Sequence, residues 1–130
     1  MKILCVCDQI DPLVYNSEIK ERFGDVDYIL SAGDLPMEYI DFIVSSLNKP
    51  AFFVFGNHNL KEYDLFHRPA NQEFGQPTIP ISTHSHGAAY AGFKIFSSKK
   101  FIIAGASGCM LYNHGKSQFS NSEMFFKLLK

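Results

Sequence analysis

Three short runs of apolar residues mark the first half of the chain, and each ends in small or polar residues. They are Ile3–Cys7, Tyr28–Leu30 and Phe52–Phe55. Each run is apolar at every position instead of every second one, which is typical of strands in a parallel sheet covered on both faces. We therefore expect three parallel strands joined by crossover helices.

Two helices are predicted between these strands. The first spans Asn16–Phe23, with Asn16 as N-cap and Gly24 as the stop signal. The second begins at Pro36, which suits a first helical turn, and ends at Asn48. Its apolar stripe has the spacing i, i+3, i+4, i+7 and consists of Ile40, Ile43, Val44 and Leu47. The first third of the chain therefore predicts a βαβαβ unit.

The second half has a weaker pattern. We predict a long loop over Asn59–Ser85 with a short helix at Leu60–Phe66. Three further strands are predicted, the last two as a hairpin: Ala88–Tyr90, Phe93–Phe96 and Phe101–Ala104. Ser120 and Glu123 have the spacing of a capping box and open a last helix that continues to Lys130. The expected fold class is α/β, in a single domain over residues 1–130.

Composition narrows the class of protein. The 130 residues have a formal net charge of −1 and include no basic stripe, so we expect no nucleic-acid partner. The apolar stretches are too short for a membrane span, and the N-terminus enters a strand after a single Lys, unlike a signal peptide. A soluble cytoplasmic protein is the expectation.

The three cysteines are too few for a disulfide framework. Cys5 and Cys7 alternate along one strand and are expected on the same face of the sheet. We interpret them as small buried hydrophobic residues, with a C-x-C metal or redox pair as the alternative.

Candidate chemistry follows the three apolar runs. Asp8 ends the first run, Asp34 the second, and the sequence Gly56-Asn57-His58 the third. Since the carboxyl ends of parallel strands meet at one sheet edge, these side chains are expected to lie together. Oxygen ligands and an imidazole at one edge suit metal-dependent phosphate-ester hydrolysis.

In such a site Asp34 is the candidate bridging ligand of two metal ions. Asp8 would bind one metal ion, Asn57 the other, and His58 would protonate the leaving oxygen. The alternatives are ordinary turn and capping residues, or a phosphate- or nucleotide-binding protein of doubly wound type. A Gly-rich phosphate loop is absent, and Gly105–Gly108 does not fit the nucleophilic serine motif.

The three blocks ending in Asp8, Gly33-Asp34 and Gly56-Asn57-His58 resemble the first three signature blocks of the calcineurin-like metallophosphoesterases. A later stretch is similar to bacterial members of that family: Ala104–Gly108, Tyr112-Asn113 and Gln118–Met124. The resemblance implies a four-layer α/β sandwich, of which this chain would be the N-terminal portion. It also implies hydrolysis of phosphomonoesters or phosphodiesters at a dinuclear site that takes Mn, Fe, Zn or Ni.

The chain departs from the family pattern at two positions near these blocks. Ile10 stands where the family usually has a histidine ligand. Asp11 either replaces that ligand or is a turn aspartate before Pro12. Met37 stands where some members have a group that orients the catalytic histidine, and Glu38 follows it.

Further histidine ligands come from the second half of the family domain. Here His84 and His86 have the H-x-H spacing but precede the strands that they should follow, so we interpret them as a surface or strand-entry pair. His67 and His114 are predicted to be exposed loop residues.

The identified ligands suffice for one weakly bound metal ion, because a dinuclear site needs more. We therefore expect an incomplete metal site, and an apolar face that leads to a homo-oligomer or needs a missing C-terminal half. The alternative is a non-catalytic, truncated relic that self-associates and binds at most one metal ion or a phosphate.

Overall fold

The structure is a computed structural model that describes residues 1–67 and 81–129. The strands are β1 (Ile3–Val6), β2 (Tyr28–Ser31), β3 (Ala51–Phe53), β4 (His84–Ser85), β5 (Ala88–Tyr90), β6 (Lys94–Ser97), β7 (Ile102–Gly105), β8 (Cys109–Met110) and β9 (Gln118–Phe119). The helices are α1 (Ile19–Phe23), α2 (Met37–Leu47), α3 (Tyr63–Phe66) and α4 (Asn121–Leu128). The middle of the predicted long loop and Lys130 lie outside the described residues.

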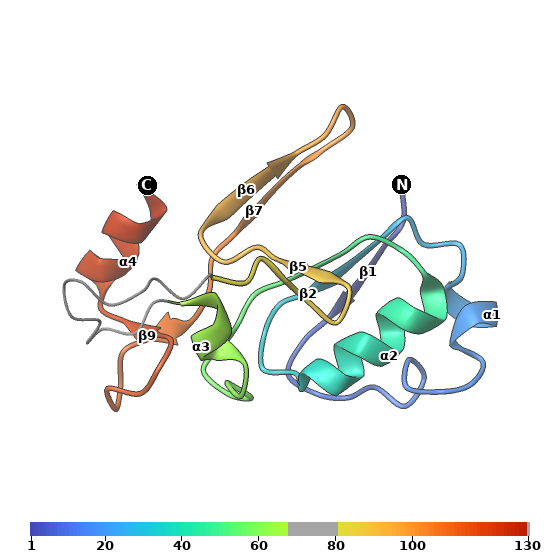
Figure 1. Cartoon of the computed structure of the whole chain (residues 1–130), viewed down its shortest axis with the longest axis horizontal. Coiled ribbons are helices and arrows are strands. Elements are labelled where there is room, and N and C mark those ends of the chain that lie inside the picture. Colours follow the sequence, from blue (N-terminus) through green and yellow to red (C-terminus); the bar gives the residue numbers. More distant parts are fainter. Residues whose placement is uncertain (68–80, 130) are drawn as a thin grey trace.

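The main sheet has the order β1-β2-β3-β5-β4. Its first four strands run parallel, and β4 is antiparallel to β5. Helix α2 lies along one face of the sheet with α1 packed beside it (Figure 1). The predicted βαβαβ start is confirmed, and the described chain is a mixed α/β fold with a mostly parallel sheet.

Helix α2 forms where the apolar stripe predicts it. Pro36 is the N-cap, and Asn48 ends the helix in the left-handed conformation with φ of 51°. Ile40, Ile43 and Leu47 are buried in the core between helix and sheet. The burial of this face explains why an 11-residue helix is stable here.

The opposite face of the parallel sheet is largely open, so the prediction of a sheet covered on both faces is wrong. Along β1, Leu4 and Val6 are buried against the helices, whereas Ile3 is 41% exposed and Cys5 is exposed. Cys7 is exposed as well, so the interpretation of both cysteines as buried residues is also wrong. An apolar run identifies the strand but cannot show whether its second face is covered.

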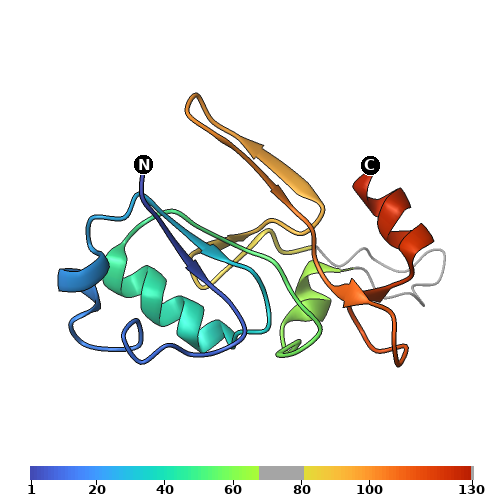
Figure 2. The same cartoon turned by 180° about the vertical axis from the view of Figure 1, so that it is seen from behind.

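The predicted hairpin is confirmed and partly shields this open face. Strands β6 and β7 pair antiparallel and project from the body of the molecule (Figures 1 and 2). The ring centroid of Phe101 lies 4.5 Å from that of Tyr28, and Phe96 lies 5.0 Å from Phe52. The hairpin therefore contacts the open face through aromatic pairs at β2 and β3.

Several predicted boundaries differ from the structure, and two of the differences have a clear physical reason. Helix α1 begins at Ile19 instead of Asn16, because the Asn16 side-chain oxygen accepts a hydrogen bond from Glu18 N and forms a separate turn. Strand β3 ends at Phe53 instead of Phe55, since the backbone of Phe55 bonds to residues beyond β7.

Helix α4 begins with the predicted capping box. The Ser120 side chain accepts from Glu123 N, and the Glu123 carboxylate accepts from Ser120 N. Across residues 1–67 and 81–129, every helix is too short or too polar to traverse a lipid bilayer.

Candidate functional site

The structure places the three predicted blocks at one edge of the sheet. Asp8 follows β1, Asp34 follows β2, and Gly56–His58 follow β3, and these three strands are neighbours. Asp8 N donates a hydrogen bond to Gly33 O at 3.2 Å, which joins the ends of β1 and β2. The expectation that the blocks converge at the carboxyl ends of the strands agrees with this arrangement.

Both aspartates have an unusual backbone conformation. The φ angle is 58° at Asp8 and 62° at Asp34, in the left-handed region that residues with a side chain seldom adopt. Such a conformation costs about 1 kcal/mol and is concentrated at functional sites. Two adjacent strand ends thus carry a carboxylate on a strained turn.

Asp34 lies at the centre of the site. Its Oδ1 accepts a hydrogen bond from His58 N at 2.7 Å, and its carbonyl oxygen accepts from Asn59 Nδ2 at 2.7 Å. The carboxyl group lies directly against Gly56, where a Cβ atom would overlap it. A Cβ at Gly33 would in turn lie 2.7 Å from Gly56 N. The two glycines therefore permit a close approach of the turns after β2 and β3.

The Asn57 amide uses its nitrogen for two contacts. Nδ2 lies 2.9 Å from the hydroxyl oxygen of Tyr112 and 3.2 Å from Nε2 of His58. An amide nitrogen only donates, so Nε2 of His58 is the acceptor in this contact. The amide oxygen of Asn57 is then the atom left for a ligand. The exposed His58 ring can also reach solvent.

Cys7 adds a thiol beside the carboxylates. A hydrogen bond from the thiol to Asp8 raises the pKa of Cys7, and the negative charges of Asp8 and Asp34 act in the same direction. The protonated thiol is therefore favoured, which is the form that does not bind metals.

Asp11, Met37 and Glu38 lie at or beside the positions where the chain departs from the family pattern, and each has different surroundings. Asp11 Oδ1 accepts from Leu13 N at 2.8 Å, as a turn aspartate does. Met37 is buried in the core. Glu38 is 3.6 Å from Lys61 Nζ, and its pKa is lowered by its own backbone N–H first and by Lys61 second.

His84 and His86 are far from these strand ends in the sheet order. Strand β4 forms the edge opposite β1. His86 Nε2 lies 2.8 Å from Glu62 Oε1, and its Nδ1 lies 3.6 Å from Asp41 Oδ1. The hydrogen bond with Glu62 raises the pKa of His86. His86 therefore belongs to an ion-pair cluster with Asp41 of α2 and with Glu62, the residue before α3.

The prediction that His67 is exposed is wrong, whereas His114 is exposed as predicted. His67 stacks on the Tyr63 ring with centroids 3.7 Å apart, and Tyr90 Oη lies 2.9 Å from its Nε2. Burial lowers the pKa of His67. Its burial depends on aromatic residues distant in sequence, which the local pattern does not reveal.

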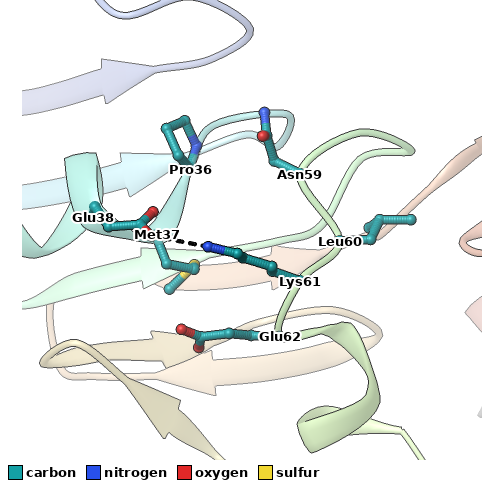
Figure 3. Close-up of a pocket in the computed structure, with 7 residues that line it drawn as sticks. All are labelled: Pro36, Met37, Glu38, Asn59, Leu60, Lys61 and Glu62. Carbon is teal, nitrogen blue, oxygen red and sulfur yellow. Dashed lines mark ion pairs between the residues drawn. The ribbon is translucent and has the colours of Figure 1, made fainter.

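A pocket of about 340 Å³ adjoins the site (Figure 3). It lies between Pro36–Glu38, which follow Asp34 closely, and Asn59–Glu62, which follow His58 directly. The Lys61 side chain extends towards Glu38 across it (Figure 3). The pocket therefore lies beside the turns that carry Asp34 and His58.

Two residues of the site were not identified from the sequence. Ser107 is 1% exposed and joins the site to a later segment, because its hydroxyl bonds both the N–H and the carbonyl of Phe55. Tyr112 contacts Asn57. Both residues lie in the stretch that is similar to bacterial metallophosphoesterases. That similarity gives neither residue a role, so it did not identify them.

Three side chains at the strand ends carry oxygen atoms of the kind that divalent cations bind. They comprise the carboxylates of Asp8 and Asp34 and the amide oxygen of Asn57. In the part of the chain that the structure describes, no group of three or more His, Cys, Asp and Glu side chains could hold a metal ion. Three oxygen donors are too few for two octahedral metal ions.

Comparison of the chain with models of known protein families, with curated proteins and with solved structures gives no match. The resemblance to the calcineurin-like metallophosphoesterases therefore rests on the motif residues themselves.

Proposed function

We propose that this chain carries part of a metal-dependent phosphoesterase site, in the N-terminal portion of a metallophosphoesterase-like α/β sandwich. Asp8, Asp34 and Asn57 bind a divalent cation, and phosphomonoesters or phosphodiesters are the substrates. The observation that supports this proposal most is the environment of Asp34. Asp34 has a left-handed backbone conformation, its carboxylate lies against Gly56, and it follows β2, the middle one of the three neighbouring parallel strands β1, β2 and β3.

A bound cation, Asp34 and His58 would have separate roles in the hydrolysis. A bound divalent cation would polarise the phosphoryl oxygen and lower the pKa of a bound water. Asp34 orients the turn of the third strand through His58 N. His58, exposed at the strand ends, accepts or donates a proton at the attacking or leaving oxygen.

The three ligands limit what this site does alone. Two octahedral metal ions that share one carboxylate require more protein ligands than these. We propose that Mn, Fe, Zn or Ni binds singly and weakly, and that a tight dinuclear centre needs ligands from outside the described residues. Hydrolysis by the described ligand set alone is expected to be slow.

One observation favours a second candidate, a non-catalytic protein that self-associates and binds one metal ion or a phosphate. The projecting hairpin of β6 and β7 carries exposed apolar side chains, including Ile95 at 74% and Ile102 at 71% exposure. Patches of this kind mark interaction surfaces.

Hydrolysis of bis(p-nitrophenyl) phosphate and p-nitrophenyl phosphate with and without Mn²⁺ tests the enzymatic proposal. We expect Mn²⁺-dependent release of nitrophenol that falls to background in Asp34→Asn and at least about 100-fold in His58→Asn. Asp25→Asn is the matched control, because this exposed carboxylate pairs with Lys2 before β2, at the amino ends of the strands. Metal binding without hydrolysis would favour the non-catalytic candidate.

A further inference from the structure

Asn57 is held by a residue far away in sequence. Its Nδ2 donates to the Tyr112 hydroxyl at 2.9 Å across a separation of 55 residues. Tyr112 lies in the loop between β8 and β9 and is exposed. A hydrogen bond to an exposed loop is informative only where that loop is itself fixed.

The β8–β9 loop is fixed by its own polar side chains. Gln118 Oε1 accepts from the backbone N–H groups of Tyr112 and Asn113, each at 3.2 Å. Asn113 Oδ1 accepts from Gly115 N at 3.1 Å and from Gln118 Nε2 at 2.6 Å. These four hydrogen bonds hold the loop backbone around Tyr112 in place, so the backbone position of Tyr112 does not depend on the contact with Asn57.

The same unit is anchored next to the third strand end. Phe55 N donates to Ser107 Oγ at 2.9 Å, Ser107 Oγ donates to Phe55 O at 2.8 Å, and Gly108 N donates to Phe55 O at 2.6 Å. Phe55 directly precedes Gly56-Asn57-His58. The segment from Ser107 to Gln118 therefore lies against the end of β3 and contacts the site through Tyr112.

We propose that Tyr112 is a positioning residue that orients the amide of Asn57 for metal binding. An Asn side chain has two N–H donors, and here the Tyr112 hydroxyl and His58 Nε2 accept one each. The amide oxygen is thereby directed away from both partners and left for the cation. This inference rests on the proposed function, because the orientation of the Asn57 amide matters only where its oxygen binds a metal ion.

Two measurements on Tyr112→Phe test this role. The first is the pair of Asn57 side-chain amide signals in ¹H–¹⁵N spectra without metal, assigned with Asn57→Asp. The second is the Mn²⁺ dissociation constant from water-proton relaxation. The control is Tyr15→Phe, in an exposed tyrosine whose ring packs on Tyr39 and Phe42.

We expect Tyr112→Phe to shift the two amide signals of Asn57 and to weaken Mn²⁺ binding about 10-fold, while Tyr15→Phe changes neither. Unchanged amide signals would overturn the inference. Shifted signals with unchanged Mn²⁺ affinity would overturn it too, because the contact would then be structural only. Absence of Mn²⁺ binding by the unmodified chain contradicts the proposed function instead, and the amide signals alone then decide whether Tyr112 orients Asn57.

Discussion

Replacing Gly56 by alanine tests whether the Asp34 carboxylate is held as the structure shows. The new Cβ would overlap the carboxyl group, and even Oδ2 would lie only 2.6 Å away. Asp34 must then rotate, which breaks the hydrogen bond from His58 N to Oδ1. A hydrogen bond to a charged group contributes about 1.5–3 kcal/mol. Because Asp34 is only partly buried and His58 is exposed, we expect a loss near the lower value, about 1.5 kcal/mol.

A double-mutant cycle isolates this contact. Asp34→Gly removes the carboxyl group and tolerates the φ angle of 62° at this position. In that background Gly56→Ala should reduce the free energy of unfolding by less than about 0.5 kcal/mol, because the three atoms nearest the new Cβ all belong to the removed carboxyl group. Urea unfolding of the four proteins measures both steps. An equal loss in the two backgrounds would refute the packing of Asp34 against Gly56.

Two further predictions concern pH and a buried hydroxyl. The pKa of His86 is raised by Glu62, so its contribution to stability is present below about pH 6.5 and is lost as the pH rises through the folded-state value. Urea unfolding should therefore show His86→Gln less stable than the unmodified chain at pH 6, by less than about 1 kcal/mol, with a smaller difference at pH 8.5. A difference that grows with pH would contradict this sign. Ser107→Ala leaves Phe55 N unbonded and should lower the free energy of unfolding by about 1–3 kcal/mol. Ser31→Ala is its matched control, since the buried Ser31 hydroxyl has no partner among the described residues and its loss should cost nothing; equal effects of the two changes would rule out the bridging role of Ser107.

Much of the fold follows from local patterns. The stripe of α2, with Pro36 before it and Asn48 after it, predicts the helix correctly because its caps and its apolar face agree. The hairpin and the capping box at Ser120 are equally local. The predicted start of α1 is wrong, because the Asn16 side chain can accept from a backbone N–H in a preceding turn as readily as at a helix start.

The open sheet face could not be predicted from the strands. Ile3, Leu30 and Phe52 give their strands continuous apolar runs, yet Ile3 is exposed and the other two are only partly buried. Burial of the second face depends on which other segments pack against it, and the sequence of the strand does not determine this. A continuous apolar run therefore predicts parallel pairing better than it predicts coverage of both faces.

The candidate site, too, is partly predictable from the sequence and partly not. The positions of Asp8, Asp34 and Gly56–His58 follow from strand ends, which the sequence shows. The contact of Asn57 with Tyr112 and the burial of His67 against Tyr90 join segments distant in sequence. Such contacts depend on the path of the whole chain, so local spacing does not reveal them.

The most direct test of the account is the number of Mn²⁺ ions bound per chain, measured by equilibrium dialysis for the unmodified protein, Asp34→Asn and the control Asp25→Asn. The account predicts saturation at a single Mn²⁺ per chain in the unmodified protein and in Asp25→Asn, with binding lost in Asp34→Asn. No binding by the unmodified chain, or binding that Asp34→Asn leaves unchanged, would contradict it.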